Sequence, residues 1–471
     1  MTPVKRNLTV LVAALGAAIS LSCGGVRATR SANPRADDSA RAGALSSVRF
    51  EDHTREIVGD ALKLIAKNQR EGAPLDQRWY AMRRFQENLR RILEAREVRF
   101  YGGREIDVRS VIANQYVSLT PFEPGQSSSE IRLFAARRDG DGFDLVIIGQ
   151  NGREVALKTA IRLIYLFKFS DEKIKGARAG GLNAFVQRIK IFLSSITPKQ
   201  EFTAFFERYG IDNPDAVFIG FQGDTRAVLK QAGIEDPKRY SNDSLRVNWY
   251  PDANGKKVLV VSINGNRIFA GRAGDLIKAI FETFHTAPRA LVFFGSGGAI
   301  ADADLVGRIV VPTVVVQDDF FIPDQRGGKL AQIVPNCAAP LLPIRSAHVS
   351  VENAVVETTT WAALKSRKWI TTVDQELYHV VNAVNALPQG GDLRFFAGIL
   401  VTDDVSTLNA GDEITLQNAQ DTIARTATVR RAFIAKILEE IGITRETVET
   451  GRSTADGAQP SNLCASARPR R

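Results

Sequence analysis

The feature that most constrains the fold is an alternation of apolar runs and helical patterns between about residue 212 and residue 450. Short runs rich in Val, Ile and Phe are typical of buried strands, and amphipathic stretches between them are typical of helices. The expected strands are Val217–Phe221, Val258–Ile263, Ala290–Phe294, Ile309–Val316 and Phe395–Val401; the expected helices are Ala270–Phe284, Glu376–Ala386 and Asp421–Ile441. This alternation predicts an α/β domain over residues 212–450, with a central mixed, largely parallel sheet flanked by helices.

The chain has 471 residues, more than one hydrophobic core usually serves, and a smaller α+β domain is expected over residues 48–205. Helical periodicity runs from about Val48 to Glu97 and recurs at Leu182–Phe192. Between them, the apolar segments Ile131–Ala136 and Phe143–Ile148 flank a Gly- and Asp-containing turn, which predicts a hairpin. No motif in this part carries recognisable chemistry, so its role is not readable from sequence.

Residues 1–23 have the pattern of an export signal. Lys5 and Arg6 precede the apolar run Leu8–Leu21, which is too short to span a bilayer as a mature helix. Cys23 then follows Ser22, an arrangement that resembles the bacterial lipoprotein signal, although Ser20 stands where that signal usually has Leu or Val. The resemblance implies a lipid on Cys23 and an outer-membrane or periplasm-facing lipoprotein. Ordinary cleavage, giving a soluble periplasmic protein, is the alternative.

The composition of residues 24–47 and 451–471 predicts that neither segment forms a hydrophobic core. Residues 24–47 are rich in Ala, Arg, Ser, Gly and Asp without apolar periodicity, so we expect a flexible linker that holds the rest of the chain off a membrane. Residues 451–471 have a similar composition and are expected to be a disordered tail.

Charge and histidine spacing argue against two classes of function. The net charge is +10, from 62 basic and 52 acidic residues, but no basic cluster alternates with stacking aromatics. We therefore expect no nucleic-acid partner, and at most a weak attraction to anionic membrane lipid. The four histidines share no metal-ligand spacing, so neither a metal nor another cofactor is expected.

A glycine-rich segment gives the first indication of a binding site. The run Ala290–Phe294 is followed directly by Gly295-Ser296-Gly297-Gly298, which would let a ligand approach the backbone closely. Val306-Gly-Arg-Ile-Val-Val-Pro-Thr313 comes next, and an acidic pair closes the following strand. This succession resembles the nucleoside phosphorylase and nucleosidase superfamily, and the resemblance extends over roughly residues 215–441. It implies a homo-oligomer, either a dimer or a trimer of dimers.

The resemblance also assigns roles to individual residues. Asp403, in the sequence Thr-Asp-Asp at the end of an expected strand, matches the acid that protonates or hydrogen-bonds N7 of the departing purine. Glu376 matches the carboxylate that binds the ribose 2′ and 3′ hydroxyls, and Trp361 matches an aromatic residue that stacks on the base, with core packing as its alternative. The residues matched to phosphate or nucleophile binding are Gly223, Arg226, Arg246, Gly295, Ser296 and Gly297.

The expected activity is cleavage of the N-glycosidic bond of a small-molecule purine nucleoside, with water or phosphate as the nucleophile. Phe293 stands where phosphorylases place a further phosphate-binding Arg, and the turn Asn264–Arg267 departs from the family's Gly-rich turn. The Glu that activates water in hydrolytic members has no match near the first strand. A module that binds nucleosides or nucleotides without cleaving them, or a storage protein, therefore stays an alternative.

Overall fold

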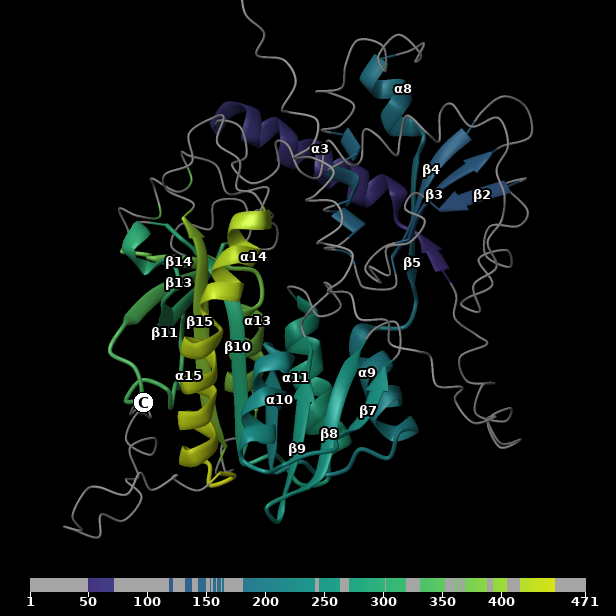
Figure 1. Cartoon of the computed structure of the whole chain (residues 1–471). Helices are drawn as coiled ribbons and strands as arrows, with labels where there is room; N and C mark the ends of the chain where they lie inside the picture. The colour runs from purple at the N-terminus through teal and green to yellow at the C-terminus, as the bar shows by residue number, and fades with distance from the viewer. Residues whose placement is uncertain are drawn as a thin grey trace, which may run out of the picture. The chain divides into compact units, whose positions relative to one another are not determined.

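The computed structural model places two β-sheets and the helices around them (Figure 1). The residues that it describes are 50–71, 118–121, 132–137, 143–149, 153, 156–157, 159–161, 163–164, 181–241, 245–262, 271–300, 302–318, 331–351, 361, 365, 369–387, 393–404 and 416–444. The signal, Cys23, the linker and the tail expected from the sequence lie outside them. The domain boundaries expected from the sequence stay predictions.

Among the described residues, the larger sheet has ten strands and contains every strand from residue 216 onward. Its strands are β6 (Ala216–Ile219), β7 (Lys238–Ser241), β8 (Arg246–Ala253), β9 (Lys256–Val261), β10 (Ala290–Ala299), β11 (Ile309–Asp318), β12 (Ala331–Ile333), β13 (Arg345–Val351), β14 (Thr372–Asp374) and β15 (Arg394–Asp404). The five runs expected as strands correspond to β6, β9, β10, β11 and β15, so these predictions are confirmed.

The pairings make this sheet mixed. Five are parallel: β6 with β9, β6 with β10, β10 with β15, β11 with β13 and β13 with β14. Five are antiparallel: β7 with β8, β8 with β9, β10 with β14, β11 with β12 and β11 with β15. The α/β class is therefore confirmed, but parallel pairings do not outnumber antiparallel ones among the described strands.

Five of these strands close into a ring. β10 pairs with β15, β15 with β11, β11 with β13, β13 with β14, and β14 returns to β10. A second arm, β6-β9-β8-β7, extends from the other part of β10. β10 is therefore the strand at which the ring and the open arm meet. β15 pairs with the whole of β10, whereas β6 and β14 pair with its first and last parts.

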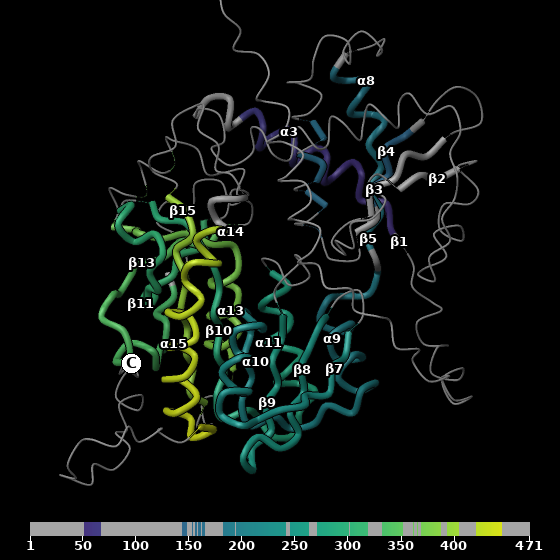
Figure 2. Tube along the Cα trace, in the orientation of Figure 1, coloured from purple at the N-terminus to yellow at the C-terminus, as the bar shows by residue number. Residues whose placement is uncertain are grey.

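Helices cover both faces of the open arm. Residues of α9 (Pro198–Arg208), α11 (Gly271–Thr283) and α13 (Leu377–Asn385) share one buried cluster with Val217, Ile219, Leu291 and Phe293. Residues of α10 (Gln222–Gln231) and α15 (Ala427–Glu440) share another with the alternate positions of the same strands. The period of two along β6 and β10 is why successive side chains enter different cores. Figure 2 shows α15 lying along β10 and β15.

The smaller sheet has the order β1-β5-β4-β3-β2. Its elements are β1 (Phe50–Asp52), α3 (Thr54–Glu71), β2 (Ser118–Pro121), β3 (Arg132–Arg137), β4 (Phe143–Gly149), α8 (Gly181–Gln187) and β5 (Ile189–Ser194). The expected hairpin is confirmed as the antiparallel pair β3–β4.

Three helices expected from the sequence need correction. The chain from Val48 first forms β1 and becomes helical only at α3. The expected helix Leu182–Phe192 ends at Gln187, because Ile189–Ser194 form β5 and pair with β1 and β4. The expected helix Asp421–Ile441 is two helices, α14 (Leu416–Arg425) and α15, separated by Thr426.

Two further observations concern the environment of the chain. None of the helices in the described part combines the length and apolar character that crossing a bilayer requires. Cys337, which lies buried just after β12, is disulfide-bonded. The chain has three cysteines, and both others lie outside the described residues.

Candidate functional site

The candidate site is at the end of β10, where two strands meet one glycine. Gly298 pairs with Asp403 of β15 on one side and with Val373 of β14 on the other. Asp403 and the segment that leads to Glu376 therefore flank the same residue, although they come from parts of the sequence about thirty residues apart. Of the residues predicted from sequence, the register sets Asp403 beside the glycine-rich segment, and Glu376 follows three residues after Val373.

The glycine-rich segment is strand, and the expectation of a strand exit at Phe294 is wrong. Gly295, Ser296 and Gly297 continue β10 in parallel register with β15. A Cβ on Gly297 would lie 2.3 Å from the carbonyl oxygen of Val373, because β14 passes directly over this position. Glycine is thus required here by the close approach of another backbone.

One edge of β10 changes partner within this segment. β6 pairs with Ala290–Phe293, and β14 pairs only with Gly298 and Ala299. Between them, at residues 294–297, none of the described strands pairs with this edge. Since successive residues of a strand direct their N–H groups to opposite edges, backbone donors face this interval. Ligands in α/β proteins commonly bind where a sheet changes partner in this way.

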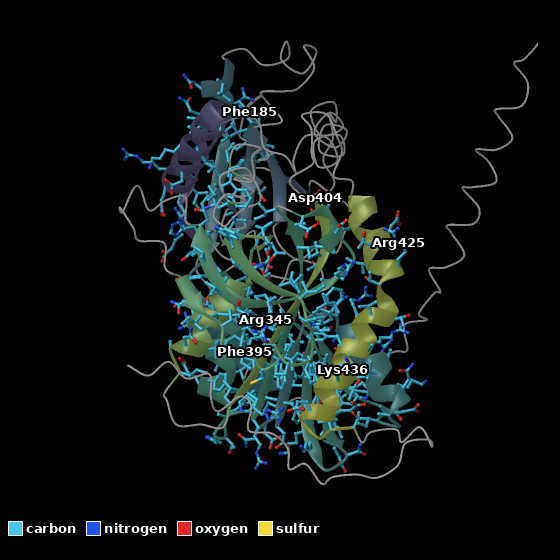
Figure 3. All side chains as sticks on the ribbon, turned by 90° about the vertical axis from the view of Figure 1, so that its left-hand side faces the viewer. Phe185, Arg345, Phe395, Asp404, Arg425 and Lys436 are labelled. Carbon is cyan, nitrogen blue, oxygen red and sulfur yellow. The ribbon has the colours of Figure 1, made fainter. Side chains whose placement is uncertain are left out.

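Asp403 lies at the end of β15, the strand whose opposite ends are marked by Phe395 and Asp404 in Figure 3. The Thr402 hydroxyl oxygen lies 2.6 Å from Asp403 Oδ1 and 3.2 Å from the carbonyl oxygen of Gly297. Since a hydroxyl carries one proton, it donates to the nearer carboxylate oxygen. Thr402 therefore fixes the orientation of Asp403 beside β10, and Asp403 remains partly exposed.

Glu376 is the N-cap residue of α13, but its side chain does not cap the helix. The capping acceptor is Asp374, whose carboxylate oxygens lie 3.0 and 3.3 Å from the amide nitrogen of Leu377. Glu376 is half-buried. Between them, the side-chain oxygen of Gln375 is buried and has no hydrogen-bond partner within the described part of the chain. Polar groups therefore line this turn.

Trp361 is buried, with 6% of its surface exposed. Its indole nitrogen donates to Asp318 Oδ2 at 2.6 Å, and the same carboxylate accepts an ion pair from buried Lys365 at 2.5 Å. Trp361 belongs to the same buried cluster as Ile300, Val349 and Ile370. These observations support core packing, the alternative to base stacking, and the bond to Asp318 places Trp361 beside the end of β11.

The expected loop Gly223–Arg226 is the first turn of α10. The chain reaches it through Gly220 and Phe221, which both have positive φ, at 99° and 38°. Gly223 has helical backbone with open space where a Cβ would be, so nothing in the described surroundings requires glycine there. Arg226 is exposed and close enough to Tyr250 to oppose the rise in the pKa of its phenol that burial causes.

Asp224, in the same turn, forms ion pairs with two arginines of α15. Its carboxylate accepts Arg430 Nε at 2.6 Å and Arg431 Nε at 3.0 Å, which ties α10 to α15. Asp224 and Arg430 are both buried, and the Arg430 guanidinium also lies 4.7 Å from the Phe221 ring centre. A buried carboxylate in such a pair is not available to activate water.

Arg246 is the first residue of β8 and is exposed. Its carbonyl accepts the Ser262 amide, and its Cα is in register with Ser241 at the edge strand β7. β8 and β7 lie in the open arm and are the third and fourth strands from β10. The described contacts therefore do not bring Arg246 to the glycine-rich segment.

The sequence reasoning missed a buried polar network beside Glu376. His348 and Ser350 of β13 lie against Asp374 of β14: the Ser350 hydroxyl donates to Asp374 Oδ1 at 2.6 Å, and His348 Nε2 lies 2.9 Å from the same oxygen. The run Arg345–Val351 contains His and Ser, and this polar content gave no indication that most of the run is buried. Among the described residues, no group of His, Cys, Asp and Glu is arranged to hold a metal ion.

Comparisons with known proteins give fold-level similarities only. No protein-family model matches, and no curated protein matches. Among solved structures, the chain is similar to Campylobacter jejuni 5′-methylthioadenosine/S-adenosyl homocysteine nucleosidase, with 13% identity, a TM-score of 0.38, and coverage of 48% of this chain and 100% of the other. The chain is also similar to the Neisseria meningitidis 5′-methylthioadenosine/S-adenosylhomocysteine nucleosidase in complex with methylthio-immucillin-A. The identity is 15%, the TM-score is 0.36, and the match covers 48% of this chain and 98% of the other. For Arabidopsis thaliana 5′-methylthioadenosine nucleosidase the identity is 14%, the TM-score is 0.37, and the match covers 49% of this chain and 97% of the other. At these scores the similarity establishes neither family nor activity for this chain.

Proposed function

We propose that this chain cleaves the N-glycosidic bond of purine nucleosides at the end of β10. The observation that carries the proposal is the register of Gly298, which pairs with Asp403 on one side and Val373 on the other. This register sets a partly exposed carboxylate on one flank of the interval 294–297 and the turn containing Glu376 on the other.

The two carboxylates are proposed to have different roles in the reaction. The bond between the sugar and the base breaks through an oxocarbenium-like state, and the base leaves more easily if a proton or hydrogen bond meets the charge that develops on it. Asp403, oriented by Thr402, is the proposed acid. Glu376 is proposed to accept hydrogen bonds from the sugar hydroxyls, a charge-assisted contact worth about 1.5–3 kcal/mol.

Water is favoured over phosphate as the nucleophile. Phe293 is fully buried in β10 and offers no cation near the glycine-rich segment, and Asp224 is held by Arg430 and Arg431. The segment Gly223–Arg226 is helical and not a phosphate-cradling loop. Exposed Arg226, at the start of α10, is a cation that supports phosphorolysis.

A binding module without catalysis is the second candidate. The observation that favours it is Asp224, since its ion pairs leave no base for water in the part of α10 where hydrolytic relatives are expected to carry one. Such a module would bind nucleosides through Glu376 and Asp403 and release them unchanged.

Export of the chain, with a lipid on Cys23 and a membrane-facing location, is also proposed. The disulfide of Cys337 supports this, since disulfides persist in oxidising compartments outside the bacterial cytoplasm. Cys23→Ala is expected to release the protein from the membrane fraction. Unchanged partition after detergent extraction would count against lipidation.

The test of the activity compares three proteins with purine nucleosides, with and without phosphate. The wild type should release free base, and ribose or ribose 1-phosphate identifies the nucleophile. Asp403→Asn keeps the shape and removes the proton source, so kcat should fall by about 10²–10⁴-fold while nucleoside affinity stays similar. Asp304→Asn, on the exposed 3-10 helix Ala303–Leu305, is a matched control and should leave kcat unchanged. Binding without release of base under either condition would favour the binding module.

A further inference from the structure

Glu376 is attached to a buried polar network that involves three elements. Asp374, at the end of β14, has a side chain only 1% exposed, and His348 of β13 is fully buried. Asp374 accepts the Ser350 hydroxyl at 2.6 Å and the Leu377 amide at 3.0 Å. Burying an ionisable carboxylate this completely is costly unless its oxygens are used, and here they are.

The network satisfies the first amides of α13. The Leu377 amide donates to Asp374, and the Tyr378 amide donates to the Ser350 hydroxyl oxygen at 2.9 Å. These amides are donors that a helix leaves without intrahelical partners. The carboxylate of Asp374 also interacts favourably with the positive end of the helix dipole. Both acceptors belong to strands of the ring, so the start of α13 is fixed to β13 and β14.

His348 closes the far side of the network. Its Nε2 lies 2.9 Å from Asp374 Oδ1, within ion-pair distance though not in hydrogen-bond alignment, and its Nδ1 lies 2.8 Å from the Thr372 hydroxyl. The ring is thus held between two residues of β14. This limits the positions that Asp374 can take.

We infer that Asp374 is a positioning residue for Glu376, and that Ser350 supports it. Asp374 comes two residues before Glu376, and the amide it caps comes directly after, so the backbone is held on both sides of the proposed sugar-binding carboxylate. A displacement of about 1 Å at such a group can cost about 10²-fold in rate. The inference rests on the proposed function, because it assigns Glu376 to the sugar hydroxyls.

The readout is discrimination between adenosine and 2′-deoxyadenosine, expressed as the ratio of their kcat/KM values. In the wild type the ratio should be about tenfold or more, the equivalent of a charge-assisted hydrogen bond. Asp374→Asn has the same shape but replaces one oxygen acceptor with a donor, and the ratio should fall toward one. Loss of stability alone reduces the active fraction for both substrates equally and leaves the ratio unchanged.

Thr197→Ala is the matched control, because Thr197 caps α9 through the Gln200 amide and its side-chain hydrogen bonds among the described residues are to Gln200. It removes a cap of similar kind, about 0.5–2 kcal/mol, and should keep the wild-type ratio. If Asp374→Asn does not fold, Ser350→Ala, which removes the acceptor of the Tyr378 amide, should lower the ratio to a smaller extent.

The outcomes separate the inference from the function on which it rests. A wild type that discriminates, together with an Asp374→Asn or Ser350→Ala protein that does not, supports both. A wild-type ratio retained in folded Asp374→Asn overturns the positioning role and leaves the proposed function intact. A wild type that neither cleaves nor binds either nucleoside overturns the proposed function and, with it, the role assigned to Asp374.

Discussion

The carbonyl group of Val373 in β14 comes close to Gly297 of β10, and substituting this glycine tests the geometry of the candidate site directly. In Gly297→Ala the new Cβ would lie 2.3 Å from the carbonyl oxygen of Val373 and 3.0 Å from Ile399 Cγ2. Ordinary contacts between such atoms are about 3.3–3.6 Å, so β14 has to move away by about 1 Å. This displaces the pairing of Gly298 with Val373, on which the position of Glu376 depends.

The expected cost combines two terms. Overpacking a close contact costs about 1–3 kcal/mol, and weakening one strand hydrogen bond adds about 1 kcal/mol, for a total of about 2–4 kcal/mol of unfolding free energy. Gly223→Ala is the control: Gly223 is helical, and its Cβ would meet nothing within 4 Å. That substitution should raise the unfolding free energy by about 0.5–1 kcal/mol.

Guanidinium unfolding of the full chain, followed by tryptophan fluorescence, gives the two shifts. The midpoint should fall for Gly297→Ala and rise slightly for Gly223→Ala. A Gly297→Ala protein as stable as the wild type would show that β14 does not pass close to this glycine, and the proposed register around Gly298 would be wrong.

Three further predictions follow from the described contacts. Asp224→Ala leaves Arg430 buried without its carboxylate, so the unfolding free energy should fall by about 3–5 kcal/mol while kcat of the folded protein stays unchanged; a normal midpoint with lost kcat would instead indicate a catalytic Asp224. Gln375→Met removes a buried oxygen that has no hydrogen-bond partner among the described residues, so the free energy of unfolding, measured by thermal unfolding, should rise by about 1–3 kcal/mol. A fall in the free energy of unfolding would indicate that this oxygen has a partner outside the described residues. A mature protein with a lipid on Cys23 and a disulfide at Cys337 should show no free thiol when titrated after denaturation, and peptide mapping should pair Cys337 with Cys464; one free thiol would contradict lipidation.

The strands β6, β9 and β10 were predictable because each contains a continuous apolar run. Val258–Val261 in β9 is an example, and burial on both faces of a sheet produces that pattern. Strands β13 and β14 of the ring were not expected. β13 contains His348 and Ser350, which are buried and contact Thr372 and Asp374 of the neighbouring strand β14, and a sequence cannot show such partners.

The glycines were misread for a related reason. Glycine usually breaks a strand, so the sequence favoured a turn after Phe294. In the structure β10 continues, and Gly297 is required by the carbonyl of Val373, which is 76 positions later in the chain. Conversely, Gly223 resembled part of a phosphate loop but lies in a helix with open space around it. Local pattern located both segments, but their roles depend on contacts distant in sequence.

A crystal structure of the full chain with a bound purine nucleoside tests the central claim most directly. The account predicts the base beside the Asp403 carboxylate, the sugar hydroxyls within hydrogen-bond distance of Glu376, and the ligand against the interval 294–297 of β10. A nucleoside bound elsewhere on the molecule, or Asp403 and Glu376 on opposite sides of the sheet, would contradict it.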